Sequence, residues 1–121
     1  MCYDGGGSMG LKHDLQDILD DVKVKMREIY GEYLDKIILY GSYARGDYRD
    51  ESDIDIMVLV KCGDDEIKKL RKNLTLAASR LGLEYDIYIS IKVKSSDYFD
   101  SWKDIMPFFK NVKVEGIEIY A

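Results

Sequence analysis

Two aspartates separated by a single residue, Asp53 and Asp55, are the residues of this sequence best suited to chemistry. They open the run DIDIMVLV, whose apolar residues predict a β-strand. Side chains two apart on a strand point to the same face, so both carboxylates share one face. Neighbouring carboxylates repel unless a cation neutralises them, and Mg²⁺ prefers such oxygen ligands together with substrate phosphates. The pair therefore predicts a divalent-cation site for a phosphate-bearing substrate.

A Gly-Ser pair, Gly41 and Ser42, precedes Asp53 by ten intervening residues. Glycine has no Cβ, so a phosphate can approach the backbone there, and Ser42 offers its hydroxyl and its amide at the start of the helical turn that follows. The apolar residues 37–40 just before the pair predict a strand that is covered on both faces. We therefore expect an anion-binding corner one strand away from the two carboxylates.

This order of residues resembles the signature of the DNA polymerase β-type nucleotidyltransferase superfamily. The longer stretch GSYARGDYRDESDIDIMVLV is similar to the minimal nucleotidyltransferases, small single-domain proteins often encoded beside a HEPN-type partner. The terminal stretch PFFKNVKVEGIEIYA resembles the closing segment of the same family. The resemblance implies an α/β (α+β) fold with a mixed β-sheet of about four strands flanked by helices.

A third acid, Asp86, lies in the alternating run EYDIYISIKV, which predicts a further strand. An acid inside an apolar strand is costly unless it is paired or binds metal. Members of the superfamily place their third acid on the strand next to the Asp-x-Asp strand, so the resemblance points to the same residue. Glu84 is the nearest competitor, at the start of the run. We expect Asp53, Asp55 and Asp86 to converge as catalytic metal ligands.

The resemblance also implies a reaction. Two Mg²⁺ ions on the three acids would support attack of a hydroxyl on the α-phosphate of a nucleoside triphosphate, with ATP as the expected donor of AMP. Gly41, Ser42 and Arg45 would hold the other phosphates, because the family pattern Gly-Ser-x-Ala-Arg-Gly is matched here. The alternative for Arg45 is a solvated or carboxylate-paired side chain.

The family implies an acceptor as well, since minimal nucleotidyltransferases act as antitoxins that transfer AMP to a tyrosine of a HEPN toxin. Two other hypotheses stay open. The chain could be a catalytically silent nucleotide- or partner-binding antitoxin module, or a plain structural domain.

Length and composition limit the remaining choices. At 121 residues and 14.0 kDa, we expect one domain over residues 11–121, preceded by a Gly-rich flexible tail over residues 1–10. The net charge is -5, with 23 acidic and 18 basic residues, which disfavours an extended nucleic acid as substrate. Cys2 and Cys62 are expected to be reduced thiols. No stretch is apolar enough for a bilayer span or a signal peptide, so we expect a soluble cytoplasmic protein.

The flanking elements are predicted from their periodicity. Residues 11–33 show an apolar stripe at helical spacing, and a second helix is expected from Asp64 to a stop at Gly82. The aromatic residues of segment 94–121 fit closure of the core. A contact surface for a partner or for a second copy of the chain, and hence a homo-oligomer, is the alternative.

Overall fold

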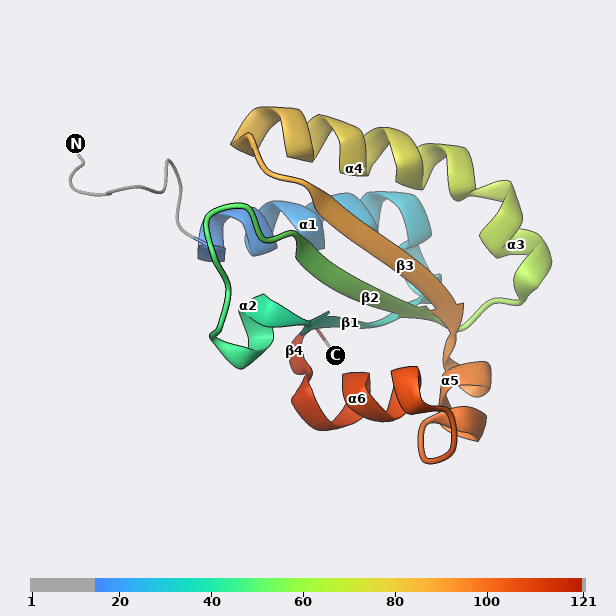
Figure 1. Ribbon diagram of the computed structural model, residues 1–121. Coiled ribbons are helices and arrows are strands. Elements are labelled where there is room, and N and C mark those ends of the chain that lie inside the picture. The colour runs from blue at the N-terminus through green and yellow to red at the C-terminus, as the bar shows by residue number, and fades with distance from the viewer. Residues whose placement is uncertain (1–14, 121) are drawn as a thin grey trace.

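A mixed sheet of four strands forms the centre of the computed structural model, which describes residues 15–120 (Figure 1). The strand order is β3-β2-β1-β4. Strand β1 (Leu34–Tyr40) pairs antiparallel with β2 (Ile54–Val60) and with β4 (Ile117–Tyr120), and β3 (Ile89–Ser95) runs parallel to β2. The predicted α/β (α+β) class with about four strands in a mixed sheet is confirmed. The predicted tail, residues 1–10, lies outside the described residues.

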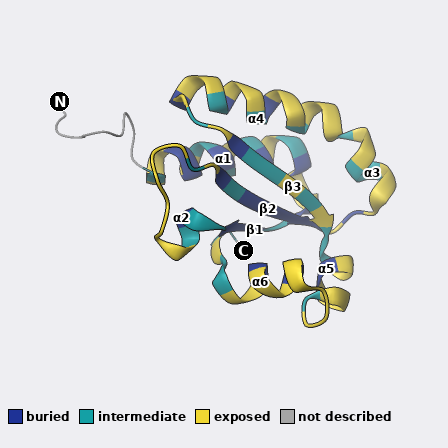
Figure 2. Ribbon diagram, in the orientation of Figure 1, coloured by how far each residue is buried: buried dark blue, intermediate teal, exposed yellow. Residues whose placement is uncertain are grey.

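Alternation along β2 divides the apolar interior into two layers. One layer holds Ile54, Ile56, Val58 and Val60 and is covered by α1 (Leu15–Tyr30) and α4 (Arg71–Tyr85). The other holds Met57 and Leu59 and is covered by α5 (Ser96–Trp102) and α6 (Pro107–Glu115). Figure 1 shows the two pairs of helices on opposite faces of the sheet, and β2 is buried along most of its length in Figure 2. The predicted division of β2 into two faces is confirmed, and it fixes the face on which Asp55 lies.

The first helix follows its predicted stripe. Its buried residues recur at intervals of three and four: Ile18, Leu19, Val22, Met26 and Tyr30. A 3₁₀ turn, η2 (Gly31–Tyr33), leads directly into β1. The hydroxyl of Tyr85 donates a hydrogen bond to Asp21, so the end of α4 is held against α1.

The connection between α4 and β3 differs from the prediction. After α3 (Asp64–Lys69), helix α4 continues past Gly82 to Tyr85, and Asp86 caps it with φ 55 and ψ 46. Aspartate tolerates this left-handed conformation better than most residues. Gly82 serves a different purpose, because a Cβ there would lie 2.9 Å from the carbonyl oxygen of Ile87, where the chain folds back. The expected stop at Gly82 and the expected strand at residues 84–88 are therefore wrong.

The C-terminal aromatics divide into two groups. Phe99 and Phe109 are buried against the second face of the sheet, which confirms core closure. Tyr98, Trp102 and Phe108 are exposed together with their neighbours Ile105 and Met106. The contact surface predicted for this segment stays a prediction.

Two smaller predictions concern cysteine and membranes. Cys62 is a buried free thiol. Within residues 15–120, no helix combines the length and the apolar character that crossing a membrane requires.

Candidate active site

The corner between β1 and α2 (Ser42–Arg45) brings the Gly-Ser pair against the first strand carboxylate. Gly41 has φ 76 and ψ -156, a conformation essentially restricted to glycine. A Cβ on Gly41 would overlap Oδ2 of Asp55 and would lie 3.2 Å from its Cγ. The carboxylate of Asp55 therefore packs directly on the backbone of Gly41. The Gly-Ser corner and the strand that carries Asp55, which the sequence predicted to be neighbours, are in contact.

The two aspartates of the Asp-x-Asp pair differ in their surroundings. Asp53 is exposed just before β2 begins, whereas Asp55 lies within β2, is partly buried and pairs with Tyr40 of β1. Burial raises the pKa of the Asp55 carboxyl, and the negative charge of Asp53 raises it further, while Lys92 and Arg45 act in the opposite direction. Ionising both carboxylates thus costs free energy that a bound cation would offset.

The donor set fits one divalent cation. Mg²⁺ is commonly held by one or two carboxylates together with substrate phosphates and water. Asp53 and Asp55 supply the carboxylates, and the absence of a Cβ at Gly41 lets the Asp55 carboxylate lie against the corner.

The predicted third ligand lies elsewhere. Asp86 caps α4 and lines a groove of about 710 Å³ between that helix and β3. Its charge is not among those that shift the pKa of Asp55. No three Asp, Glu, His or Cys side chains among residues 15–120 form a group that could hold a metal ion. The structure therefore does not bring Asp86 together with Asp53 and Asp55, because the chain is still completing a helix cap where a strand was expected.

The neighbours of Asp55 on β3 are Ser90 and Lys92. In the parallel register Ser90 pairs with Asp55, and Lys92 pairs with Met57, two residues further along the same face. The sequence did not single out Ser90, since its pairing with Asp55 depends on where β3 starts.

Arg45, the predicted phosphate ligand, is held by two carboxylates. Its Nε lies 3.2 Å from Asp47 and its Nη1 lies 3.2 Å from Glu115 at the end of α6. Both contacts raise the pKa of the guanidinium. The structure thus shows the carboxylate-paired arrangement that was the alternative for this residue.

An aromatic pair extends the site toward the exposed C-terminal aromatics. Tyr40, opposite Asp55, is buried, and burial followed by the charge of Asp55 raises its pKa to about 12. Its ring meets that of Phe108 edge-on with the centroids 5.5 Å apart, and Phe108 is 40% exposed. An apolar path therefore leads from the surface of α6 to the carboxylate. From the sequence, Tyr40 was predicted only as a residue of the strand over 37–40.

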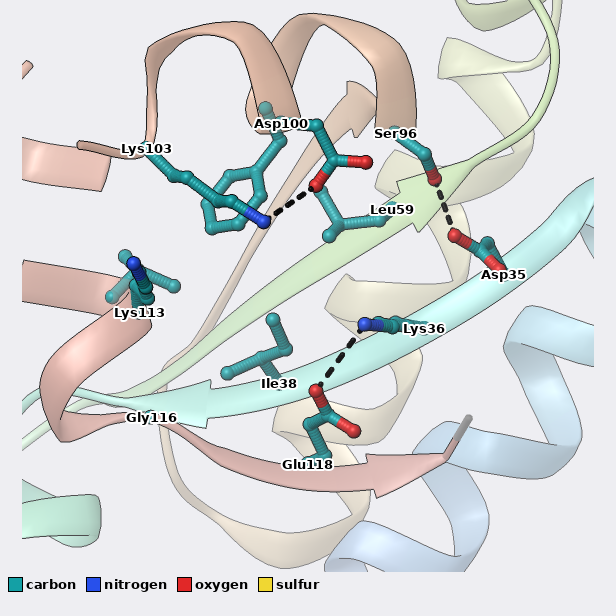
Figure 3. Close-up of a pocket in the computed structure, with 12 residues that line it drawn as sticks. Asp35, Lys36, Ile38, Leu59, Ser96, Asp100, Lys103, Lys113, Gly116 and Glu118 are labelled. Atoms are coloured by element: carbon teal, nitrogen blue, oxygen red, sulfur yellow. Dashed lines mark hydrogen bonds and ion pairs between the residues drawn. The ribbon is translucent and has the colours of Figure 1, made fainter. Parts of the chain in front are cut away.

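A second cavity, of about 250 Å³, opens on the same sheet face near the start of β1 (Figure 3). Its charged groups satisfy one another: Ser96 donates to Asp35 at 2.6 Å, Lys36 lies 3.4 Å from Glu118, and Lys103 lies 3.3 Å from Asp100. The first pair joins α5 to β1, the second joins β1 to β4, and the third lies at the end of α5, so these groups are already engaged within the fold and the corner at Gly41 is the better candidate.

Comparison with known proteins identifies the class to which this site belongs. The family model described as a nucleotidyltransferase domain matches residues 19–113, and the chain belongs to that family. A relative from Methanocaldococcus jannaschii, named "Putative protein adenylyltransferase MJ0141", is 42% identical over 77 residues, which make up 64% of this chain and 76% of that protein. Within the family, this chain is a minimal nucleotidyltransferase, as the resemblance of its motif implied.

Solved structures show the same fold. One is a toxin-antitoxin crystallised with AMP-PNP, with a TM-score of 0.61 and 22% identity over 84% of this chain and 72% of that one. Another is the Shewanella oneidensis complex of a tri-AMPylated HEPN toxin with its MNT antitoxin, with a TM-score of 0.56 and 20% identity over 88% of this chain and 71% of that one.

Proposed function

We propose that this chain is a Mg²⁺-dependent adenylyltransferase that moves AMP from ATP to a tyrosine hydroxyl of a HEPN-type partner, and so acts as the antitoxin of a toxin-antitoxin pair. The hydroxyl oxygen forms a bond to the α-phosphorus of ATP, the bond from that phosphorus to pyrophosphate breaks, and the hydroxyl proton passes to solvent. The family and the names that its relatives carry support this choice.

One observation carries the proposal: the carboxylate of Asp55 rests on the Gly41 corner. A triphosphate on that corner would lie beside Asp55 of β2, and Asp53 comes just before that strand. Bound Mg²⁺ would neutralise charge on the carboxylates and on the phosphates. Asp53 and Asp55 would hold it, while Gly41 and Ser42 would receive the phosphates.

Hydrophobic surface near the site favours a protein as the acceptor. Phe108 is exposed next to Tyr40, and Trp102, Ile105 and Met106 extend the apolar surface over α5, α6 and the turn between them. A partner that docks its own apolar surface there would bring a tyrosine toward Asp55. A small polar acceptor would bury little of this apolar surface.

The test is transfer of label from ATP labelled at the α-phosphate. The protein is incubated with Mg²⁺ and a purified HEPN-type protein as the proposed partner, and label is expected on that partner. Asp55→Asn should lower the rate by at least about 100-fold, the usual cost of losing one group that stabilises transition-state charge. Label on RNA, or no label on any acceptor, would refute the proposed acceptor.

A silent binding module is the second candidate, and the missing third carboxylate is the observation that favours it. Calorimetry separates the two functions. An enzyme should bind ATP more tightly with Mg²⁺ and lose that gain in Asp55→Asn. A protein that binds the partner tightly, and transfers no label at any Mg²⁺ concentration, would be the module.

A further inference from the structure

The edge strand β3 presents a positive charge to the face of the two aspartates. Met57, the residue opposite Lys92, belongs to the apolar layer on the Asp55 face of the sheet. Ile89 and Ile91, the neighbours of Lys92 along β3, pack in the layer on the opposite face. Lys92 therefore emerges on the Asp55 face, one alternate position beyond Ser90.

Two cations act on Asp55 from this face, and they differ in how far they are already engaged. Arg45 is shared between Asp47 and Glu115, each at 3.2 Å. Lys92 is exposed, and among residues 15–120 no hydrogen bond or ion pair engages its ammonium group. Lys92 is thus the less engaged of the two cations that act on Asp55.

A triphosphate brings more negative charge than one divalent cation can offset. The described residues supply Asp53 and Asp55 and no third acid grouped with them to hold a second cation. A lysine ammonium binds phosphate as a compact point charge on a flexible stem. Lys92 can supply the missing positive charge from the strand on which a third acid was expected.

We propose that Lys92 is a phosphate-binding residue of this site, and that with it the site takes one divalent cation rather than two. The proposal rests on the proposed function, because it concerns the same nucleotide. The ammonium group reaches the triphosphate from β3, while Asp53 and Asp55 hold the cation from β2. Ser90, which is neutral, pairs with Asp55 and precedes Lys92 by two residues on β3.

Lys94 provides a matched control. It is two residues further along the same face of β3, it is also exposed, and its Nζ lies 5.8 Å from the ring centroid of Tyr98. Lys92→Ala and Lys94→Ala remove the same charge from the same strand at different distances from the site. Lys92→Arg keeps the charge at the proposed position.

The test is ATP binding by calorimetry, in EDTA and again in excess Mg²⁺, so that the measurement does not depend on turnover. Lys92→Ala should weaken binding by roughly 10- to 100-fold, the range for one hydrogen bond to a charged group. Lys94→Ala should bind ATP within about twofold of the wild type, since Lys94 lies two residues further from the site than Lys92 and solvent ions partly screen its charge. Lys92→Arg should restore most of the affinity.

The outcomes separate the two proposals. If the wild type binds ATP and Lys92→Ala binds it equally well, the role of Lys92 is refuted while the proposed function stands. If both lysine variants weaken binding equally, the effect is general surface charge and the specific role is also refuted. If the wild type binds no ATP even with Mg²⁺, both proposals fall.

The cation count tests the second half. Equilibrium dialysis with Mn²⁺ and a non-hydrolysable ATP analogue should give one bound Mn²⁺ per bound nucleotide. Two ions per nucleotide in the wild type would refute the single-cation site.

Discussion

Replacing Gly41 by alanine is the sharpest probe of the site, because it adds one methyl group between the corner and Asp55. The added Cβ would overlap Oδ2 of Asp55 and would lie 3.3 Å from the Cβ of that residue. The backbone at φ 76 and ψ -156 is also unfavourable for any residue with a Cβ. The substitution therefore affects both the fold and the position of the carboxylate.

The two costs can be added. Backbone strain in this region costs about 1–3 kcal/mol. Displacing a packed neighbour costs about 1–3 kcal/mol more. A total of about 2–6 kcal/mol, at roughly 4 °C per kcal/mol for a domain of this size, predicts a melting temperature lower by about 8–24 °C.

Gly46→Ala is the matched control. Gly46 also has a positive φ, 85, but no atom lies within 4 Å of a Cβ built there. Alanine at this position should cost only about 1–2 kcal/mol of backbone strain. The difference between the two variants in urea unfolding measures the collision with Asp55.

A double-mutant cycle tests the collision directly. Combining Gly41→Ala with Asp55→Ala removes the carboxylate that the new methyl group would meet. The two changes should therefore couple favourably by about 1–3 kcal/mol. Equal losses for Gly41→Ala and Gly46→Ala, together with no coupling in the cycle, would refute the packing of Asp55 on the corner.

Three further predictions follow from single side chains. Asp55→Asn should be more stable than the wild type at neutral pH and equally stable below pH 3.8. The raised pKa of the Asp55 carboxyl means that its ionisation destabilises the folded state, and this cost sets in as the pH rises through the usual value of 3.8. Urea unfolding at the two pH values checks this, and a stability difference independent of pH would contradict it. Tyr30→Phe should raise the free energy of unfolding by about 1 kcal/mol in the same assay, because the buried Tyr30 hydroxyl has no hydrogen-bond partner among the described residues; a loss of stability would show that the hydroxyl is satisfied. Asp86→Asn should leave ATP binding with Mg²⁺ unchanged within about twofold, since asparagine also tolerates the left-handed cap and the residue lies outside the site; a loss comparable to that of Asp55→Asn would restore the third-ligand hypothesis.

The sequence predicted the parts of the site that local patterns determine. Alternation along β2 gave the face on which Asp55 lies, because side-chain direction on a strand has a fixed period of two, while the shared face of Asp53, which precedes the strand, stays a prediction. The glycine of the Gly-Ser pair was predicted to admit a phosphate; in the structure the group that approaches Gly41 is the carboxylate of Asp55, and the phosphate contact stays a prediction. These features depend on neighbouring residues, so the chain order is enough to find them.

The parts that the sequence could not give depend on where elements begin and on distant partners. The run that contains Asp86 alternates like a strand, yet α4 extends to Tyr85 because Tyr85 is buried at its end and bonded to Asp21. The start of β3 then determines that Ser90 pairs with Asp55. Arg45 of α2 pairs with Glu115 of α6, which is 70 residues away along the chain.

The contact between Arg45 and Glu115 makes the C-terminal helix a reporter of whether Arg45 moves when ATP binds. Where Lys92 alone meets the phosphates, Arg45 stays on its two carboxylates and amide hydrogen exchange in the last turn of α6 stays unchanged. Where a phosphate instead draws the guanidinium away from Glu115, that turn loses its ion pair with α2 and its amides exchange faster, in a part of the chain that the nucleotide itself need not touch. By the same linkage, a protein that binds α6 and fixes its position would keep Arg45 on its two carboxylates and lower the affinity for ATP.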